Sequence, residues 1–273
     1  MAADFGPLVP ADWLVEHLDE VQVVDVRWYL NGRSGWDAYR EGHIPGAVWL
    51  DVDTDLSAPA SPQAGRHPLP TEAAFAAALA RKGIAEGRPV VAYDDASGSV
   101  AARLWWMLRA IGEPAAVLEG GLVAWTDQQG ELDTEIPTPL RAERAVRPWP
   151  SDRFVSADEL AASDAAVFDA RSAERYAHGD PAIDPRPGHV PGARSAPWTG
   201  NLDAHGRFLA PDGLRERFAS AGNGAIAYCG SGVTACHDLL AMTLAGYTDL
   251  ALYPGSWSQW GADGSRPAEV PAR

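Results

Sequence analysis

Short apolar runs alternate with longer segments of helical periodicity through most of the chain. The runs have the length and composition of buried strands, and they occupy residues 21–27, 89–93, 166–171 and 225–228. Apolar residues at helical spacing between them predict helices over residues 10–18, 71–82, 99–111, 211–219 and 235–244. Buried strands that alternate with helices are typical of parallel sheets. We therefore expect an α/β fold in which helices cover both faces of a parallel sheet.

This pattern occurs twice along the chain. In the first copy, a strand ending in Asp-x-Arg at residues 25–27 precedes a Gly-His-x-Pro-Gly-Ala turn at residues 42–47. In the second copy, the same two motifs lie at residues 169–171 and 188–193. The period is far too long for a solenoid, so we predict two similar domains, each with its own parallel sheet.

A proline-rich and charged stretch separates the two copies. Residues 133–153 contain four prolines among many charged side chains, which indicates an extended linker. Ser156 and Glu159 have the spacing of a capping box, so a helix should begin the second domain. The expected domains are therefore residues 5–132 and 154–270, joined by the linker.

A cysteine follows the last predicted strand, at the start of a loop of small residues. Cys229 comes directly after the apolar run, and Gly230–Thr234 lead into the helix expected at residues 235–244. Chemistry in α/β folds lies at the carboxyl ends of strands. The loop glycines allow successive backbone N–H groups to converge on one point, backed by the helix dipole. We expect the loop to bind an anion and to hold Cys229 as a nucleophilic thiolate.

The first copy has a carboxylate where the second has the thiol. Asp94 occupies the position that matches Cys229. Because a carboxylate cannot act as a sulfur nucleophile, we predict that the first domain is catalytically silent. It could still supply residues to a cleft between the domains.

Several other polar residues are expected to be structural. Asp25 and Asp169, like His43 and His189, recur in both the silent and the active copy, so they should fix turns rather than perform chemistry. Cys236 lies seven residues after the first cysteine, two helical turns along, and we interpret it as a small packing residue rather than a resolving thiol.

Composition limits the classes of function. The formal net charge of −15 opposes binding to nucleic acid or anionic lipid. The chain has no apolar stretch of membrane-spanning length, and Met1–Phe5 lacks the features of a signal peptide. Only two cysteines occur among 273 residues, which argues against a secreted disulfide scaffold. We therefore expect a cytoplasmic location.

Taken together, the motifs resemble those of a known superfamily. The paired Asp-x-Arg and Gly-His-x-Pro-Gly-Ala motifs, the Cys-Gly-Ser-Gly-Val-Thr loop and the closing segment Leu252–Trp257 look like the tandem-domain rhodanese superfamily over roughly residues 5–265. Within it, the loop is similar to that of the 3-mercaptopyruvate sulfurtransferases. The resemblance implies an inactive N-terminal domain, an active C-terminal domain, a substrate site at their interface, and no cofactor or metal.

It also implies a double displacement. The thiolate of Cys229 would take the sulfur of 3-mercaptopyruvate, release pyruvate as its enolate and hold the sulfur as a persulfide. A thiol, thioredoxin or cyanide would then accept it. The backbone donors of Gly230, Gly232, Val233 and Thr234 would stabilise the thiolate and the persulfide.

Other residues match the family one at a time. Arg175 matches an arginine expected to hold the substrate carboxylate, for which the bidentate geometry of guanidinium is suited. Arg186 is a candidate second substrate arginine. Ser231, His67 and Asp53 match a serine–histidine–aspartate relay, in which histidine would carry the proton near neutral pH.

Three alternatives remain. A thiosulfate sulfurtransferase of the same fold typically has basic residues directly after the cysteine, whereas this chain has Gly230 and Ser231. A dual-specificity phosphatase needs an arginine six residues after the cysteine, but Ala235 stands there. A non-enzymatic module that carries a persulfide on Cys229 is the third alternative, and failure to turn over any small donor would distinguish it.

Overall fold

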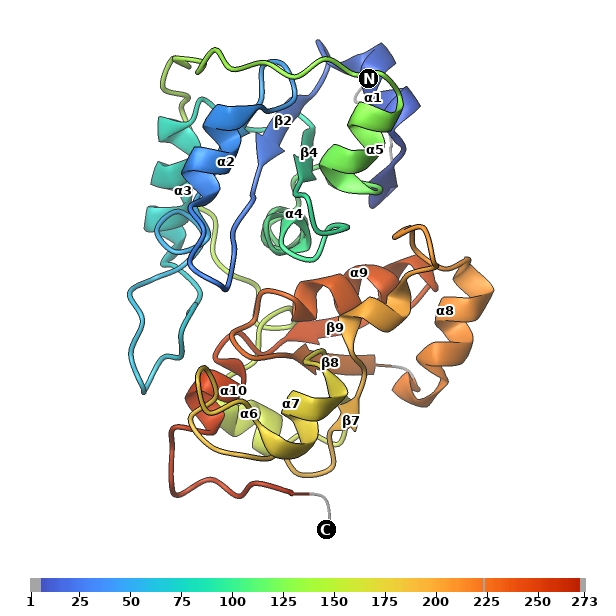
Figure 1. Ribbon diagram of the computed structural model, residues 1–273. Helices are drawn as coiled ribbons and strands as arrows, with labels where there is room; N and C mark the ends of the chain where they lie inside the picture. Colours follow the sequence, from blue (N-terminus) through green and yellow to red (C-terminus); the bar gives the residue numbers. More distant parts are fainter. Residues whose placement is uncertain (1–5, 223, 271–273) are drawn as a thin grey trace. The chain divides into compact units, whose positions relative to one another are not determined.

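A computed structural model describes residues 6–222 and 224–270 of the chain (Figure 1). The chain divides into two compact units: unit 1 combines Met1–Leu56 with Pro70–Trp149, and unit 2 combines Ser57–Leu69 with Pro150–Arg273. The Ser57–Leu69 segment, which lies within the range predicted for the first domain, thus packs with unit 2. Residues 1–5, which bear on the predicted start of the first domain and on the expected lack of a signal peptide, lie outside the described residues.

Unit 1 contains a five-stranded parallel sheet within its described residues. The strand order is β1-β5-β4-β2-β3. Its elements are β1 (Leu8–Val9), α1 (Ala11–His17), β2 (Gln22–Asp25), α2 (Gly35–Glu41), β3 (Val48–Trp49), α3 (Glu72–Arg81), β4 (Val90–Tyr93), α4 (Ala101–Ala110), β5 (Ala115–Leu118) and α5 (Gly121–Asp127).

Helices flank the sheet of unit 1. On one face, Leu14 of α1 and Trp125 of α5 pack with Val23, Val91 and other strand residues in one buried cluster. Neighbouring strand residues point to opposite faces, and α4 packs against β4 and β5 on the other face. Figure 1 shows α1 and α5 lying together beside the sheet.

Unit 2 repeats this plan with four strands among its described residues, in the order β7-β6-β8-β9. Its elements are α6 (Ala157–Ala161), β6 (Ala166–Asp169), α7 (Ala173–His178), β7 (Arg194–Ser195), the 3₁₀ helix η1 (Trp198–Asn201), α8 (Pro211–Arg217), the 3₁₀ helix η2 (Ala219–Ala221), β8 (Gly224–Tyr228), α9 (Ala235–Leu244), β9 (Asp249–Leu252) and α10 (Ser256–Trp260).

The core of unit 2 lies on both sides of this sheet. Leu160 of α6 and Trp257 of α10 pack with Ile226 and other strand residues on one face. On the other, α9 packs against β8 and β9, and Phe168 meets Phe218 edge to face at 5.4 Å between ring centroids. The predicted α/β class and the two parallel sheets flanked by helices are confirmed, and the five predicted helices form with closely similar bounds.

The Asp-x-Arg motif closes on itself in both units. In unit 2, Arg171 donates Nε and Nη2, one edge of its guanidinium, to the carboxylate of Asp169, and Nη2 also donates to the carbonyl of Gly188, at 2.8 Å. Asp25 and Arg27 make the same contacts in unit 1. The ion pairs are buried and hydrogen-bonded to the turn that follows, in agreement with the structural role expected of the two aspartates.

The histidines of the Gly-His-x-Pro-Gly-Ala turns pack in the same way. The ring of His189 stacks on Tyr176, with 3.7 Å between centroids, and its Nδ1 lies 3.2 Å from the carbonyl oxygen of Tyr176. His43 stacks on Tyr39 and bonds its carbonyl at 2.9 Å. Both contacts fix the turn against the preceding helix.

Among the described residues, none of the helices has the length and apolar character needed to cross a membrane.

Candidate active site

The candidate nucleophile lies at the carboxyl end of a central strand. β8 is flanked by β6 and β9, and its residues from Ala225 onward are buried. Cys229 follows β8 directly, and residues 229–234, called the cysteine loop from here on, lead to α9 at Ala235. Cys229 is 2% exposed. The apolar strand therefore sets the sulfur at the edge of the sheet where α/β folds place their chemistry.

The cysteine loop curls so that one of its own backbone donors reaches the sulfur. The N–H of Gly232 donates to Sγ of Cys229 at 3.1 Å. Gly232 has φ +79°, and a Cβ there would lie 2.6 Å from the carbonyl oxygen of Pro254. Both the left-handed backbone and the close approach require glycine. This curl brings a hydrogen-bond donor to the place where negative charge on sulfur would be held.

The first turn of α10 fastens the cysteine loop. The N–H groups of Trp257 and Ser258 donate to the carbonyls of Cys229 and Gly230, at 3.0 and 2.9 Å. Ser256 accepts the N–H of Cys229 on its Oγ at 3.1 Å. These bonds hold both the start of the loop and the residue after the nucleophile against one helix.

A histidine of unit 2 reaches the cysteine loop from far away in the sequence. The Nδ1 of His67 lies 2.8 Å from Oγ of Ser231, and both side chains are buried. The segment Ser57–Leu69 is held in place because Arg66 donates its backbone N–H to Oγ of Ser258 at 2.9 Å. The structure therefore brings together Ser231 and His67, both of which were predicted to belong to a proton relay.

An ion pair orients Arg175 toward the cysteine loop. Arg175 lies in α7 and donates Nε and Nη2 to the two carboxylate oxygens of Asp184, at 2.9 and 2.6 Å. Burial acts to raise the pKa of Asp184, but hydrogen bonds and charge from Arg175, with further charge from Arg171, hold that pKa below its ordinary value. Asp184 is therefore a carboxylate near neutral pH, and it occupies one edge of the guanidinium.

Two guanidinium groups face the backbone of Gly230. A Cβ built on Gly230 would lie 2.8 Å from Nη2 of Arg175 and 3.1 Å from Nη2 of Arg66. The second edge of Arg175 is on this side too, since its Nη1 is 3.5 Å from the same point. Positive charge therefore gathers next to the residue that follows the nucleophile.

The contacts of the other two predicted side chains, Arg186 and Asp53, are as follows. Arg186 donates Nη2 to the carbonyls of Asp263 and Arg266. Asp53 belongs to unit 1, where its carboxylate accepts the indole N–H of Trp28 at 3.0 Å.

Two loop residues predicted as backbone donors sit where the loop joins α9. Val233 is buried, and its carbonyl accepts the N–H of Cys236. Thr234 is the N-terminal cap residue of α9 and makes no side-chain cap bond. Cys236 donates its thiol to the carbonyl of Gly232 at 3.5 Å and is fully buried. These contacts agree with a packing role for the second cysteine.

The matching loop of unit 1 surrounds a carboxylate. Oδ1 of Asp94 accepts the N–H groups of Ala96 and Gly98, and Oδ2 accepts those of Val100 and Ala101, all at 2.8 Å. Burial raises the pKa of Asp94, and the four donors act in the opposite direction. Unit 1 thus forms an anion-binding loop and fills it with its own side chain.

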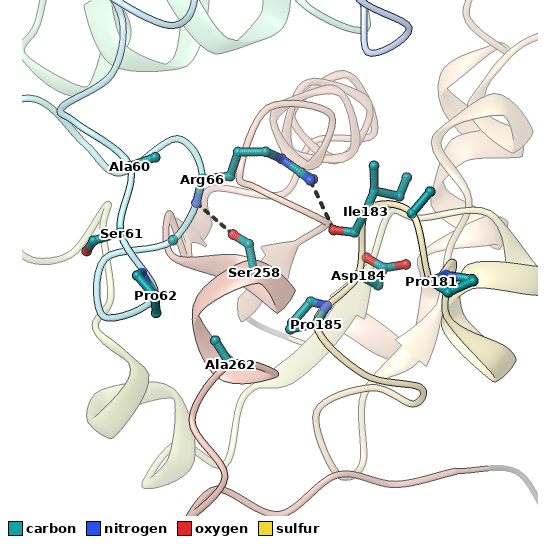
Figure 2. Close-up of a pocket in the computed structure, with 12 residues that line it drawn as sticks. Ala60, Ser61, Pro62, Arg66, Pro181, Ile183, Asp184, Pro185, Ser258 and Ala262 are labelled. Atoms are coloured by element: carbon teal, nitrogen blue, oxygen red, sulfur yellow. Dashed lines mark hydrogen bonds between the residues drawn. The ribbon is translucent and has the colours of Figure 1, made fainter.

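A pocket of about 570 Å³ lies beside the arginines (Figure 2). It is lined by residues of the segments 60–66 and 181–185 together with Ser258 and Ala262. Figure 2 shows the side chain of Arg66 extending to the carbonyl of Ile183, which it bonds through Nη1 at 3.1 Å. Cys229 is not among the lining residues, so this pocket borders the groups that hold the arginines rather than the nucleophile.

Sequence reasoning missed two residues of this arrangement. Arg66 stands next to His67 in a Gly-Arg-His-Pro segment, and Asp184 stands two residues before Arg186. The available signals were the position of Arg66 beside a predicted proton carrier and the position of Asp184 near a predicted substrate arginine. Neither sequence position reveals that Asp184 pairs with Arg175, because that contact depends on how residues 180–185 fold back on α7.

Comparison with known families accounts for both units. The family model described as the Rhodanese-like domain matches residues 10–128 and 156–263. The chain belongs to the rhodanese family. The two matches correspond to the two copies of the sequence pattern, so this rhodanese is a tandem protein.

Similar proteins of nearly equal length carry sulfurtransferase names. A protein from Pseudomonas aeruginosa named as a probable 3-mercaptopyruvate sulfurtransferase is 41% identical over 275 residues, covering 95% of this chain and 96% of its own. The 3-mercaptopyruvate sulfurtransferase of Escherichia coli is 38% identical over 96% of this chain and 97% of its own. A Mycobacterium tuberculosis relative that carries the name "Putative thiosulfate sulfurtransferase SseB" is 36% identical over 93% of this chain and 92% of its own.

A crystal structure gives the same assignment of fold. The 3-mercaptopyruvate sulfurtransferase SseA of Escherichia coli superposes with a TM-score of 0.82 at 33% identity, covering 93% of this rhodanese and 99% of its own chain. The predicted superfamily is therefore confirmed, and the relatives include proteins named for each of the two sulfur donors, 3-mercaptopyruvate and thiosulfate.

Proposed function

We propose that this rhodanese is a 3-mercaptopyruvate sulfurtransferase. The observation that carries the proposal is the surroundings of Cys229: the N–H of Gly232 meets its sulfur, the Ser231–His67 pair lies two residues away in the loop, and Arg175 faces Gly230. A sulfur nucleophile, a proton carrier and a cation for a carboxylate are the three groups that an anionic thiol donor requires.

In the first half-reaction, the thiolate of Cys229 attacks the sulfur of 3-mercaptopyruvate. The new S–S bond forms as the C–S bond breaks, and the electron pair of that bond leaves on carbon as the enolate of pyruvate. Protonation of the enolate carbon gives pyruvate, and the sulfur remains on Cys229 as a persulfide. The N–H of Gly232 supports this step because it already bonds the sulfur and can hold negative charge there.

In the second half-reaction, an acceptor thiolate attacks the outer sulfur of the persulfide. The S–S bond to Cys229 breaks, the Cys229 thiolate leaves with the bonding pair, and the acceptor departs as a persulfide. Thioredoxin, a small thiol or cyanide would serve as acceptor. We propose that this exchange occurs in the C-terminal domain, since the matching position of the N-terminal domain is Asp94. We propose a cytoplasmic location on the basis of the low cysteine count, two among 273 residues.

The Ser231–His67 pair is proposed to supply the proton that the enolate needs. A serine hydroxyl within 2.8 Å of an imidazole nitrogen can pass a proton to an adjacent base and recover it from the ring. Asp53 is proposed as the third member of this relay on the strength of its match to the family motif alone. Replacing Asp53 by Asn and measuring the pH profile of turnover tests that assignment.

Thiosulfate is the second candidate donor. The Mycobacterium tuberculosis relative is named for that donor, and the cations at Gly230 would also attract a dianion. The cysteine loop itself lacks the basic residues of the thiosulfate branch.

Steady-state turnover of the two donors with cyanide as the common acceptor decides between them, with Cys229→Ser as the inactive control. We expect a kcat/KM for 3-mercaptopyruvate that exceeds that for thiosulfate by at least about tenfold, or about 1.4 kcal/mol. The reverse preference would identify a thiosulfate sulfurtransferase. Persulfide on Cys229 without turnover of either donor would favour a non-enzymatic carrier.

A further inference from the structure

Two arginines from distant parts of unit 2 meet at the cysteine loop. Arg175 arrives from α7 and Arg66 from the Ser57–Leu69 segment, and the Nη2 atoms of both lie close to the position of a Cβ on Gly230. Like charges repel, so two guanidinium groups that face one small space are favoured when an anion lies between them. This space lies at Gly230, the residue that follows the candidate nucleophile Cys229.

Each guanidinium is held in its orientation by other groups. Asp184 occupies the Nε–Nη2 edge of Arg175, so the Nη1–Nη2 edge faces Gly230. Arg66 donates Nη1 to the carbonyl of Ile183 at 3.1 Å, which sets its Nη2 toward the same space. Groups that are oriented before a ligand arrives lose less entropy when they bind it.

The backbone beneath Arg66 is equally fixed. Gly65 has φ +93°, and a Cβ there would lie 2.6 Å from the carbonyl oxygen of Gly255, so the segment lies tightly on the turn before α10. The amide of Gln259 donates to the carbonyl of Gln63 on the same segment, at 2.5 Å. Because α10 also fastens the cysteine loop, Arg66 and Cys229 are positioned by one helix.

The arginine that the sequence suggested as the second substrate ligand has another partner. Arg186 bonds the carbonyls of Asp263 and Arg266, and its guanidinium lies 5.8 Å from the ring centre of Trp257. Its contacts join the 180–186 region to the C-terminal segment. The atoms nearest to a Cβ on Gly230 come from Arg175 and Arg66, so Arg66 shares this space with Arg175.

We propose that Arg66 is a substrate-binding residue that recognises the carboxylate of the sulfur donor together with Arg175. This inference rests on the proposed function for the identity of the donor. Arg175 offers one edge of its fork and Arg66 a second cation, so the carboxylate is held from two sides. A neutral molecule that approaches Cys229 gains nothing from this pair, which makes the site selective for anions.

Alkylation of Cys229 tests the inference without sulfur transfer. Iodoacetate carries a carboxylate and iodoacetamide does not, while both react with a thiolate by the same displacement of iodide. The variants are Arg66→Gln, Arg66→Lys and, as a control that also removes one positive charge, Arg207→Gln at an exposed position in the 203–207 loop. The ratio of the two rate constants for each protein isolates recognition of the carboxylate from reactivity of the sulfur.

We expect Arg66→Gln to lower the iodoacetate-to-iodoacetamide ratio by roughly tenfold or more, the usual effect of losing a charge-assisted hydrogen bond. Arg66→Lys should keep part of the ratio, because it retains the charge but not the fork. Arg207→Gln should leave it unchanged. Raising the salt concentration should reduce the ratio in wild type but little in Arg66→Gln.

Steady-state kinetics with 3-mercaptopyruvate completes the test. Arg66→Gln should raise KM by a similar factor with a smaller change in kcat. If both alkylation rates fall together, Arg66 only supports the loop and the inference fails. If turnover is normal but the ratio and KM do not respond to Arg66→Gln, the inference fails while the proposed function stands. If wild type turns over no donor but the ratio still depends on Arg66, the proposed function fails and anion recognition by Arg66 stands.

Discussion

His67 and Ser231 are 164 residues apart in the sequence, yet Nδ1 of the first lies 2.8 Å from Oγ of the second. Both side chains are buried in unit 2, in which the Ser57–Leu69 segment packs with the C-terminal part of the chain. The side chain of Ser231 in the cysteine loop therefore meets a histidine that comes from a short segment of the N-terminal half.

If this pair carries the proton to the enolate, removing either residue should remove the contribution of both to kcat. We expect Ser231→Ala and His67→Gln each to lower kcat for 3-mercaptopyruvate by about 10²-fold, within the usual range for general acid–base catalysis. The double variant should lose little more than either single variant, because the two residues act as a unit. Steady-state kinetics of the four proteins measures this, and independent, multiplicative losses would argue against a relay.

The sulfur itself should be found on one cysteine. After treatment with 3-mercaptopyruvate and no acceptor, mass spectrometry should show one added sulfur atom on the peptide that contains Cys229, and none in Cys229→Ser. Cys236 bonds its thiol to the carbonyl of Gly232 and is fully buried, so it should stay unmodified. Added sulfur on Cys236 would show that the nucleophile was assigned to the wrong residue.

We predict that position 230 requires glycine because of the two neighbouring arginine side chains and not because of its backbone conformation. In Gly230→Ala, the new methyl group would lie 2.8 and 3.1 Å from the Nη2 atoms of Arg175 and Arg66, which must move aside. Both are ends of flexible side chains, so we expect little change in thermal stability. The KM for 3-mercaptopyruvate should rise about tenfold or more, since the two cations no longer converge.

The control for this variant is Gly246→Ala, at a glycine just beyond the C-terminal end of α9. Gly246 has φ +90°, so alanine there should lower the melting temperature instead and leave KM unchanged. A Gly230→Ala protein with normal KM would mean that the guanidinium positions do not matter for the donor.

The buried carboxyl group of Asp238, in the helix that follows the cysteine loop, predicts that the stability of the fold depends on pH. Asp238 of α9 accepts Nδ2 of Asn201 on Oδ1 at 2.7 Å, and its Oδ2 has no hydrogen-bond partner among the described residues. Burial raises the pKa of Asp238 to about 8; the bond from Asn201 and the charge of Arg217 oppose the rise, and the charge of Asp169 adds to it.

The direction of this pH dependence follows from the protonation of Asp238 in the unfolded and folded states. The unfolded carboxyl loses its proton near its ordinary value of 3.8, whereas the folded one keeps it up to about pH 8. This group therefore contributes most to stability below about pH 3.8, and that contribution is lost as the pH rises from there to about 8. Asp238→Asn should flatten the decline in the free energy of unfolding between about pH 5 and pH 8, measured by urea titration at each pH. Parallel curves for wild type and variant would show that Asp238 is already ionised in the fold.

The sequence was sufficient for the fold because local signals agreed with one another. The apolar run before Cys229, the small-residue loop and the helix from Ala235 each had a separate signature, and the repeat supplied the main strands and turns a second time. The capping box of Ser156 and Glu159 also forms as the spacing predicted.

The site was less predictable because it depends on contacts between distant segments. The bond of His67 to Ser231 could be suggested only by resemblance, and the pairing of Arg175 with Asp184 had no signal in the spacing. Arg186 was predicted as a substrate ligand from the family resemblance, and nothing in the sequence indicated that its guanidinium bonds carbonyls of the C-terminal segment. Residue type indicates what a side chain can do, and the tertiary fold decides where it points.

The carboxylate of Asp94 gives unit 1 a permanent internal ligand. Four backbone N–H groups are satisfied by a group that is covalently part of the chain, so this loop needs nothing from solution to be stable. The persulfide that the proposed reaction forms on Cys229 is also covalent, but it exists for only part of the cycle, and the folded loop supplies a hydrogen-bond donor at the sulfur that the unfolded chain lacks. Heat resistance of unit 2, but not of unit 1, should therefore report whether the protein is loaded with sulfur, which makes unit 1 an internal reference against which the state of unit 2 can be measured.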